Sequence, residues 1–311
     1  MNYLVVGEPC VDLIHKADGG VIHSYGGILY SIITLSVLAK KEDIVIPLMN
    51  LGEDEYDNIT GILKKHPNIS IDGIYKVTHP TRKVNLYYNK YKSGKSARLE
   101  QSTEPTYTLD YSSIEKFLPE ADAMLVNMIS GVDITLETLK EIRNNFEGTM
   151  HIDIHNLVMK TNEDGTREHT SVDNWVEWCI NTDTIQMNEY EIYSLSAKKM
   201  KEYEIAEEML FHPRSKVRGV IVTRGINGSS GYIKREKSFG KEKFFDLDKR
   251  DINAIENPHF VDSTGCGDVF AASFILDFSL NNNFIKSLHY ANRIASYNTS
   301  LEGIHELYKL R

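Results

Sequence analysis

Cysteine is scarce in this sequence of 311 residues, and long apolar runs are absent. The 3 cysteines, Cys10, Cys179 and Cys266, are an odd number without a Cys-x-x-Cys pair, which argues against a disulfide framework or a structural zinc site and favours a reducing cytoplasm. No apolar run approaches the roughly 18 residues that a membrane-spanning helix requires. The segment Met1–Glu8 has neither a basic stretch nor a long apolar one, so no signal peptide is expected.

Basic residues are outnumbered, with 35 Lys plus Arg against 44 Asp plus Glu and a net charge of −9. Nonspecific binding to nucleic acid or to an anionic membrane depends on excess positive charge, so neither partner is expected. The 8 prolines are scattered, and no linker or repeat divides the chain. With 41% hydrophobic and 25% charged residues, the composition predicts a soluble, cytoplasmic globular protein with a sizeable core.

Short apolar runs alternate with amphipathic ones along most of the chain. The predicted strands are Tyr3–Val6, Ile44–Met49, Ala123–Met128, Met150–Ile154, Thr184–Met187 and Gly219–Thr223. The predicted helices are Gly27–Lys40, Glu55–Lys65, Ile134–Asn145, Glu202–Phe211, Gly265–Ser279 and Phe284–Ser300. Apolar strands without strict alternation, separated by helices, are typical of a parallel sheet that is covered on both faces. The sequence therefore predicts an α/β fold.

Two regions break this alternation of strands and helices. Val11–Ile14 and Val21–Tyr25 flank a Gly-rich turn, which predicts a hairpin. Ile74–Val77 and Lys83–Tyr91 also have the pattern of extended chain. Together they predict a small antiparallel sheet that is inserted after the first strand and again near residue 80. Such a sheet cannot bury two faces by itself, so we expect it to cover a substrate cleft, a partner subunit or both.

The segment 261–274 carries the clearest chemical signal. Gly265, Cys266 and Gly267 precede a strongly apolar helix, so their backbone amides lie at its N-terminus, where small side chains and the helix dipole favour an anion. Asp268 falls in the first turn of that helix. A carboxylate beside an anion site is electrostatically unfavourable unless it has a function, such as accepting the proton of a hydroxyl that attacks the anion. The alternative is a glycine-rich loop with Asp268 as a partner of the helix dipole.

The sequence Asp-Ser-Thr-Gly-Cys-Gly-Asp at 262–268 resembles the signature near the C-terminus of the ribokinase-like (PfkB) carbohydrate kinases, where Asp-Thr-x-Gly-Ala-Gly-Asp is usual. Three further matches lie in the family's order: Gly26-Gly27 opening a helix, Asn188-x-x-Glu191 after a strand, and Val-Thr-Arg-Gly-x-x-Gly at 222–228. The resemblance implies a three-layer fold with a mainly parallel central sheet and a small inserted β-sheet lid. The chain would be a single kinase domain, 1–311, with lid segments at about 10–25 and 74–105.

The resemblance also implies roles for individual residues. Asp268 would be the base, and the amides of Gly265, Cys266, Gly267 and Asp268 itself would form an anion hole for the γ-phosphoryl group of ATP. Asn188 and Glu191 would organise Mg²⁺ through its waters. Their alternative role is structural, with Asn188 capping a helix and Glu191 completing a capping box.

The remaining implied sites surround the nucleotide and a monovalent cation. Thr223, Gly225 and Gly228 would contact the nucleotide, and Asn298 on the last helix would border the adenine. Asn292 lies on the same helix. The alternative for both asparagines is a position on the solvated face of the helix, as ordinary surface residues. Asp262, Thr264 and the loop 300–303 resemble a K⁺ site that some relatives have.

The resemblance implies that four residues bind the acceptor: Asp12, Gly26, Gly27 and Ser31. Many sugar-specific members have Asn where Ser31 stands, and serine offers one hydroxyl instead of an amide, so ribose and simple fructose pockets are poor models. Tyr30 is expected either in the core or as an aromatic surface near the acceptor. Asp153, His155 and Asn156 follow a central strand, and His155 is expected to be structural. The side chains of Arg82, Lys83 and Arg98 are expected to be solvated, and the alternative is that they bind an acidic or phosphorylated substrate.

The leading hypothesis is an ATP-dependent kinase, a phosphotransferase that phosphorylates a hydroxyl of a sugar or sugar-like metabolite. The alternative acceptor is a nucleoside, which apolar lid residues would favour, and a homodimer through the exposed lid edge is plausible. A non-catalytic nucleotide sensor would lack the base, but Asp268 is present. Gly7-Glu8-Pro9-Cys10 is not the Gly-x-Gly-x-x-Gly of a dinucleotide-binding dehydrogenase.

Overall fold

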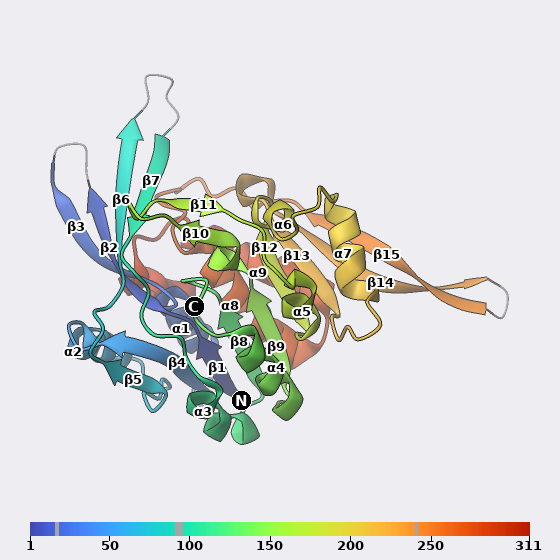
Figure 1. The fold of residues 1–311 in the computed structure, drawn as a ribbon, viewed down its shortest axis with the longest axis horizontal. Coiled ribbons are helices and arrows are strands. Elements are labelled where there is room, and N and C mark those ends of the chain that lie inside the picture. Colours follow the sequence, from blue (N-terminus) through green and yellow to red (C-terminus); the bar gives the residue numbers. More distant parts are fainter. Residues whose placement is uncertain (16–18, 91–95, 240–241) are drawn as a thin grey trace.

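The computed structural model describes residues 1–15, 19–90, 96–239 and 242–311. A nine-stranded sheet forms the centre, in the order β15-β14-β13-β12-β9-β8-β1-β4-β5, and the pairs from β13 to β5 are parallel (Figure 1). Its strands are β1 (Asn2–Val6), β4 (Ile44–Gly52), β5 (Ile74–Val77), β8 (Ala123–Asn127), β9 (Thr149–Asp153), β12 (Thr184–Asn188), β13 (Gly219–Thr223), β14 (Ser229–Phe239) and β15 (Glu242–Ile252). The predicted α/β fold is confirmed.

Helices cover both faces of this sheet. They are α1 (Leu29–Leu38), α2 (Tyr56–Leu63), α3 (Tyr111–Ile114), α4 (Leu136–Asn145), α5 (Trp175–Ile180), α6 (Glu191–Ser194), α7 (Glu202–Phe211), α8 (Cys266–Asn281) and α9 (Phe284–Asn298), with the 3₁₀ turns η1 (Glu115–Glu120), η2 (His155–Val158), η3 (Gly225–Asn227) and η4 (Ile304–Leu310). In the part of the chain that the structure describes, no helix has the length and apolar character needed to cross a membrane.

The side chains of β1 show how one strand serves two cores. Leu4 and Val6 belong to the buried cluster that also contains residues of α4, α5 and α7, whereas Tyr3 and Val5 belong to the cluster that contains residues of α1 and α8. All four side chains are at most 1% exposed. Burial on both faces explains why the strand sequence is continuously apolar instead of alternating, as expected for a parallel strand between two helical layers.

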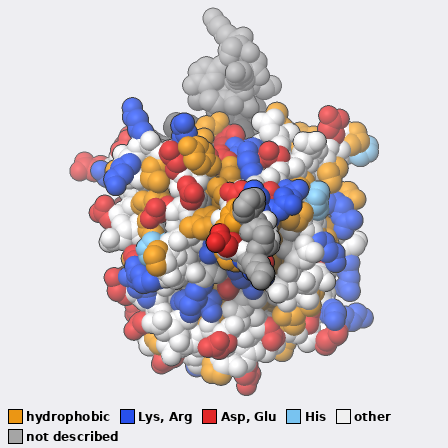
Figure 2. All heavy atoms as spheres, turned by 90° about the vertical axis from the view of Figure 1, so that its right-hand side faces the viewer, with side chains coloured by type: hydrophobic (Ala, Val, Ile, Leu, Met, Phe, Trp, Pro, Cys, Tyr) orange, Lys and Arg blue, Asp and Glu red, His pale blue; other side chains and the backbone are white. Residues whose placement is uncertain are grey.

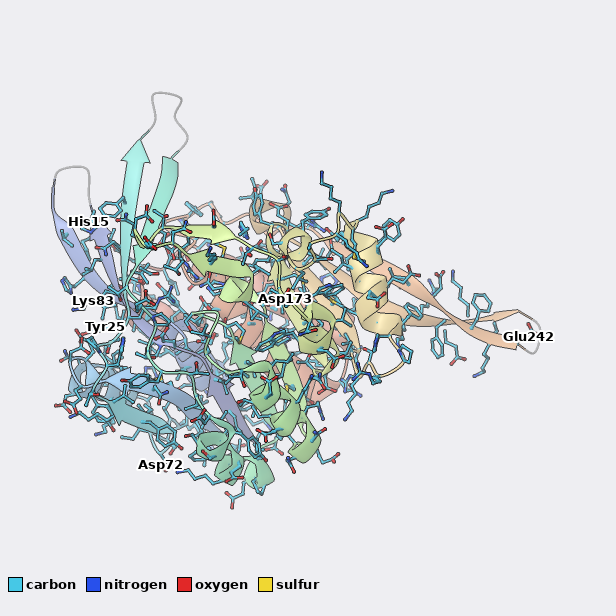
Figure 3. The ribbon with its side chains drawn as sticks, in the orientation of Figure 1. His15, Tyr25, Asp72, Lys83, Asp173 and Glu242 are labelled. Atoms are coloured by element: carbon cyan, nitrogen blue, oxygen red, sulfur yellow. The ribbon has the colours of Figure 1, made fainter. Side chains whose placement is uncertain are left out.

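A second, four-stranded sheet lies beside the body, and Figure 3 shows His15 and Lys83 on it. Its order is β3 (Val21–Gly27), β2 (Pro9–His15), β6 (Lys83–Lys90) and β7 (Ser96–Ser102), two antiparallel hairpins joined by the parallel pair β2–β6. One prediction for this region is wrong: Ile74–Val77 is not part of the small sheet. It is β5, which pairs parallel with β4 at the edge of the large sheet, because the alternation of four residues cannot specify a partner strand.

A buried group of charged residues, the lid-base cluster, joins the small sheet to the body. Glu8 directly precedes β2 and Arg82 directly precedes β6, and their side chains are 4% and 3% exposed. Arg82 Nη1 lies 3.8 Å from Glu8 Oε2 and donates to the carbonyl of Ile129 at 3.0 Å. The Glu8 amide donates to Asp133 Oδ1 at 2.8 Å, and the Thr106 hydroxyl donates to Glu8 Oε1 at 2.6 Å. The cluster therefore ties the starts of β2 and β6 to the segment that follows β8.

The expectation that Arg82 is solvated is thus wrong. Its charge is paired inside the protein, and a sequence pattern of basic residues near strands does not distinguish a surface arginine from one that neutralises buried carboxylates. Lys83 is partly exposed, and the side chain of Arg98 lies outside the described residues.

The hairpin β14–β15 extends from the opposite end of the large sheet, with Glu242 at its far end in Figure 3. On the face from which it projects, acidic and basic side chains are interspersed (Figure 2). Exposed pairs along it include Lys237 with Asp246 and Lys243 with Glu236. Two small strands, β10 (Met159–Thr161) and β11 (Arg167–His169), form a separate antiparallel pair.

Candidate active site

Polar side chains gather where four neighbouring strands of the large sheet end. Asn127 ends β8, Asp153 ends β9, Asn188 ends β12 and Thr223 ends β13. The strand register places Asn127 opposite Asp153 and Asn188 opposite Thr223. Ligands of open parallel sheets bind outside the carboxyl ends of the strands, so this edge is the expected position of a site.

The first turn of α8 faces the same edge. Gly265 has φ +74°, a left-handed conformation that favours glycine, and it starts a helix of 16 residues. The Cys266 amide donates to the carbonyl of Ser263 at 3.2 Å, so this member of the predicted anion hole is already engaged. The amides of Gly265 and Gly267 donate to no acceptor among the described residues, and a β-carbon on Gly267 would meet no atom within 4 Å. The helix N-terminus thus offers open backbone donors.

Asp268 lies in this first turn and points toward the strand ends. Asn127 Nδ2 donates to Asp268 Oδ1 at 2.7 Å. Burial raises the pKa of Asp268 to about 7 despite the hydrogen bond from Asn127, and the Asp12 carboxylate adds to the rise. A carboxyl group with a pKa near neutrality is suited to accept a proton and release it again.

Asp153, Glu191 and Asp268 form an acidic cluster without a paired lysine or arginine among the described residues. Burial, followed by the charges of Glu191 and Asp268, raises the pKa of Asp153 well above its usual value. Burial and the Asp268 charge raise the pKa of Glu191 to about 7. The basic group beside the cluster is His155, with Nδ1 4.0 Å from Glu191 Oε1 and a positive φ of 39°. Among the described residues, the cluster therefore has no full positive charge to compensate its carboxyl groups.

Two members of this edge, Asn127 and Gln186, are absent from the sequence prediction. Gln186 Nε2 donates to Asp153 Oδ2 at 2.9 Å and to the carbonyl of Gly267 at 3.0 Å, which joins β12 to the first turn of α8. The usable signal was a polar residue near the end of an otherwise apolar strand.

Asn188 and Glu191 form the capping box that was the structural alternative to a metal role. The Glu191 amide donates to Asn188 Oδ1 at 2.9 Å, and the Asn188 amide donates to Glu191 Oε2 at 2.6 Å. Within the described ranges, no three His, Cys, Asp or Glu side chains converge closely enough to enclose a metal ion. Mg²⁺ commonly retains water and binds one or two carboxylates plus phosphates, and an acidic cluster without a counter-charge fits that mode.

The predicted nucleotide loop follows β13. The Arg224 amide donates to the carbonyl of Gly228 at 2.8 Å, which closes the turn. Gly228 has φ +84° and packs so closely that a β-carbon would lie 2.0 Å from the carbonyl oxygen of Ile252. Gly225 has φ +51° with nothing within 4 Å of its β-carbon position, so its backbone is open to a ligand. Thr223 is partly buried at the start of this turn.

The surface alternative for the last helix is wrong, because both asparagines are buried, whereas the place of Asn298 beside an adenine stays a prediction. Asn298 is 2% exposed and donates to the Thr264 carbonyl at 3.1 Å and to Cys266 Sγ at 3.2 Å. Asn292 is 8% exposed and donates to the carbonyl of Asn253 at 2.9 Å. Both hold neighbouring loops in place, and their side-chain amide donors are engaged by the protein.

Two oxygens of the predicted K⁺ site, one on Asp262 and one on Thr264, accept hydrogen bonds from the protein. Asp262 Oδ1 accepts from the Thr264 amide at 3.1 Å, and the Thr264 carbonyl accepts from Asn298. The carbonyl of Thr299 accepts from the amides of Val261 and Asp262. The K⁺ site stays a prediction.

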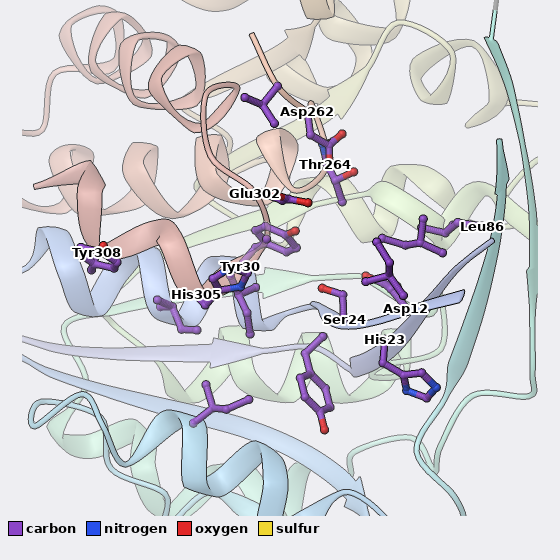
Figure 4. A pocket seen from close by; sticks show the side chains of 18 of the residues that line it. Asp12, His23, Ser24, Tyr30, Leu86, Asp262, Thr264, Glu302, His305 and Tyr308 are labelled. Atoms are coloured by element: carbon purple, nitrogen blue, oxygen red, sulfur yellow. The ribbon is translucent and has the colours of Figure 1, made fainter. Parts of the chain in front are cut away.

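A cavity of about 850 Å³ lies between the small sheet and the body (Figure 4). Asp12 and Ser24, opposite each other on β2 and β3, line it together with Tyr30 from α1 and Asp262 and Thr264 from the loop before α8. The other lining residues are Ile14, Ile22, His23, Tyr25, Ile33, Ile62, Lys65, His66, Leu86, Val261, Glu302, Gly303, Ile304, His305 and Tyr308. The predicted acceptor residue Asp12 therefore faces a space of suitable size.

The glycine pair makes room for this arrangement. A β-carbon on Gly26 would lie 2.1 Å from Asp12 Oδ2, and one on Gly27, which has φ +62°, would lie 2.5 Å from the Glu8 carbonyl oxygen. Ser31, in contrast, does not face the cavity. It has no exposed surface, and its hydroxyl donates to the backbone carbonyl of Asp268 at 3.2 Å, because this position of α1 points at α8.

Comparison with known proteins supports the resemblance. The model of the pfkB family carbohydrate kinases matches residues 169–307. No curated protein sequence matches the chain significantly.

Solved structures match over the whole length. A ribokinase from Arabidopsis thaliana, complexed with ribose and ATP, has a TM-score of 0.69 and 16% identity, covering 99% of this chain and 97% of its own. A nucleoside kinase from Burkholderia thailandensis, complexed with inosine, has a TM-score of 0.69 and 13% identity over 98% and 95%. A pyrophosphate-dependent kinase in the ribokinase family, complexed with a pyrophosphate analogue and myo-inositol, has a TM-score of 0.70 and 14% identity over 99% and 99%.

At these identities the likeness establishes the fold, while the acceptors of the three neighbours differ from one another. The resemblance recognised in the sequence is confirmed: the chain has the ribokinase fold, and residues 169–307 match the pfkB family of carbohydrate kinases.

Proposed function

We propose that this protein is a kinase that transfers the γ-phosphoryl group of ATP to a hydroxyl of a sugar or sugar-like acceptor. The observation that carries the proposal is the position of Asp268, a carboxyl group with a pKa of about 7 in the first turn of α8, beside open backbone amides. The cavity that Asp12 lines lies next to this turn, because Tyr30, Asp262 and Thr264 line the cavity and also lie beside the first turn of α8.

In the proposed reaction, Asp268 accepts the proton of the acceptor hydroxyl, whose oxygen attacks the γ-phosphorus. The bond from that phosphorus to the β–γ bridging oxygen breaks, and ADP leaves. The amides of Gly265 and Gly267 stabilise charge on the transferred group, and the α8 dipole adds to this effect. Asn127 holds the Asp268 carboxylate in position through its 2.7 Å hydrogen bond. Thr223, Gly225 and Gly228 present the turn that would contact the nucleotide.

Mg²⁺ would neutralise the triphosphate when it is bound with ATP. Glu191 and Asp153 would hold the ion through its waters, and Asn188 would orient Glu191 through the capping box. Among the residues that the structure describes, no lysine or arginine pairs with the acidic cluster, which supports this assignment, since bound Mg²⁺ would supply the missing positive charge.

The small sheet would act as the lid over the acceptor, and the chain would work as one kinase unit. Asp12 and Ser24 turn toward the cavity from its inner face. The lid-base cluster ties the start of β2 and of β6 to the segment that follows β8, so the lid would keep its register when it moves.

A nucleoside is the second candidate acceptor, and a particular observation favours it. Beyond Asp12 and Ser24, the lid presents Ile14, Ile22 and Leu86 to the cavity. Three apolar side chains suit the flat face of a base better than the hydroxyls of a free sugar.

The experiment is an ADP-release assay with purified protein, Mg²⁺, ATP and a panel of ribose, myo-inositol and inosine, the acceptors of the three neighbours. We expect acceptor-dependent ADP formation that Asp268→Asn lowers by about 10²–10⁴, whereas Asp173→Asn, a change of an exposed aspartate on the surface, has no effect. Replacing ATP with pyrophosphate tests whether this chain uses the phosphoryl donor of the pyrophosphate-dependent neighbour instead. Acceptor-independent hydrolysis only, or full activity of Asp268→Asn, would contradict the proposal.

A further inference from the structure

We infer that Tyr30 is a specificity-determining residue of this kinase: its ring separates the acceptor cavity from the first turn of α8, and its hydroxyl binds the acceptor. The inference rests on the proposed function. Sequence reasoning assigned the acceptor contact on α1 to Ser31, which is buried against Asp268 instead. Tyr30, one position earlier, is the residue from this turn that lines the cavity (Figure 4).

The ring of Tyr30 lies directly on Gly265. A β-carbon at position 265 would come within 2.3 Å of Tyr30 Cδ1 and 2.5 Å of Cε1, so the ring occupies the space that a side chain there would need. Asp268 itself is not among the residues that line the cavity, whereas Tyr30 is. An acceptor in the cavity must therefore pass the edge of this ring to bring a hydroxyl to Asp268.

Ser31 fixes the same turn from the neighbouring position. Its hydroxyl donates to the Asp268 carbonyl, so two consecutive residues of α1 contact Gly265 and Asp268. The ring is consequently held at a set position, with Tyr30 only 4% exposed. A rigid wall at this place sets how deeply an acceptor can enter and which of its hydroxyls reaches the base.

The Tyr30 hydroxyl adds a polar contact to this wall. None of the described residues provides a hydrogen-bond partner for it. Burial, and then the charges of Asp12, Asp262 and Asp268, raise the pKa of Tyr30, so the phenol stays protonated and can donate. An acceptor with adjacent hydroxyls would match these groups, accepting a hydrogen bond from Tyr30 while donating to a carboxylate. The geometry points to a polyol portion at this end of the cavity.

The test compares two substitutions in the ADP-release assay with ribose, myo-inositol and inosine. Tyr30→Phe keeps the ring and removes the hydroxyl, so we expect KM for the preferred acceptor to rise about tenfold while kcat and the Kd for ATP change less than about twofold. Tyr30→Ala removes the wall over Gly265, and we expect the order of preference within the panel to shift toward the larger acceptor. Tyr75→Phe is the matched control, since the Tyr75 hydroxyl donates to the Ser113 carbonyl away from the cavity.

The outcomes separate the inference from the proposed function. Acceptor kinetics of Tyr30→Phe equal to those of the parent, with an unchanged order of preference in Tyr30→Ala, would overturn the inference and leave the kinase assignment standing. Equal losses in acceptor use and ATP affinity would also overturn it, because they indicate a structural role. A parent protein without acceptor-dependent ADP formation would overturn the proposed function and this inference together, and that result is read before any variant is made.

Discussion

Two groups of buried carboxylates in this molecule have opposite electrostatic settings. In the lid-base cluster, burial raises the pKa of Glu8 and of Asp133, and the Arg82 charge offsets part of each rise. In the acidic cluster, burial raises the pKa of Asp153, Glu191 and Asp268, and charges within the cluster raise the pKa of Asp153 and of Glu191 further. No lysine or arginine among the described residues pairs with these three groups.

The difference separates a cluster that joins two parts of the protein from the one that we propose to be functional. A protein that buries charge only to join two parts supplies the counter-charge itself, because an unpaired buried charge is costly. A cluster that lacks its counter-charge is destabilised until a cation arrives. Perturbed pKa values are therefore informative about function mainly where the protein does not provide the compensating group.

The largest effect is expected at the base. Asp268→Asn removes the proton acceptor but keeps the shape and the Asn127 neighbour, so turnover should fall by about 10²–10⁴ with the Kd for ATP nearly unchanged. Steady-state kinetics together with calorimetric ATP titration measure the two quantities. Turnover close to that of the parent would show that Asp268 is not the base.

Removing the counter-charge from the lid-base cluster should damage stability instead of chemistry. Arg82→Met leaves two buried carboxyls unpaired, and the free energy of unfolding should fall by about 3–5 kcal/mol. Arg250→Met is the matched control, because Arg250 pairs with Asp248 on the exposed hairpin and should cost less than about 1 kcal/mol. Urea unfolding measures both. Equal losses for the two variants would remove the distinction between the clusters.

A substitution in the acceptor cavity should weaken acceptor binding without changing ATP affinity. Asp12→Ala deletes a carboxylate that lines the cavity, so KM for the acceptor should rise about 10- to 100-fold, in line with the loss of a charged hydrogen bond. ATP affinity should stay within about twofold. If both constants deteriorate together, the variant is misfolded or Asp12 does not serve the acceptor.

The acidic cluster also predicts a pH dependence of stability. The pKa values of Asp268 and Glu191, about 7, lie above those of an unfolded chain near 4, so the folded state binds these protons more tightly. The stability from each group is complete below about pH 4 and is lost as the pH rises through 7, by up to about 1.4 kcal/mol per pH unit.

Denaturant unfolding at pH 5, 6, 7 and 8 tests this dependence. Asp268→Asn should have a shallower decline than the parent, and Mg²⁺ with ATP should stabilise the parent more at pH 8 than at pH 5. Identical slopes for parent and variant would mean that Asp268 does not titrate in this range.

The smallest effect is expected at Cys266, which borders the acidic cluster. Burial raises the pKa of the Cys266 thiol to about 11; the hydrogen bond from Asn298 opposes this rise, and the charges of Asp262 and Asp268 add to it. Its alkylation by iodoacetamide should be about 100-fold slower than that of a free thiol at pH 7.5, since the thiolate is the nucleophile. Cys266→Ala should remain active. Rapid alkylation, followed by mass spectrometry, would contradict the expected burial.

The sequence by itself determined the order of strands and helices and the glycine-rich turn before α8. Apolar periodicity and turn residues act locally, which is why Glu202–Phe211 was predicted with the bounds of α7 and Asp268 could be placed in a first helical turn. Collinear motifs added the turn at Gly225 and Gly228, for which they predict nucleotide binding.

Only the tertiary structure decided which side chains meet. Three features depend on contacts between residues far apart in the chain: the partner of Ile74–Val77, the burial of Arg82, and the placement of Tyr30 instead of Ser31 at the cavity. Examples of such contacts are those of Ser31 with Asp268 and of Tyr30 with Gly265. A helix turns about 100° per residue, so neighbouring positions face different surroundings, and the local pattern does not encode which of them reaches the cavity. The acidic cluster likewise forms only when β9, α6 and α8 are brought to one edge of the sheet.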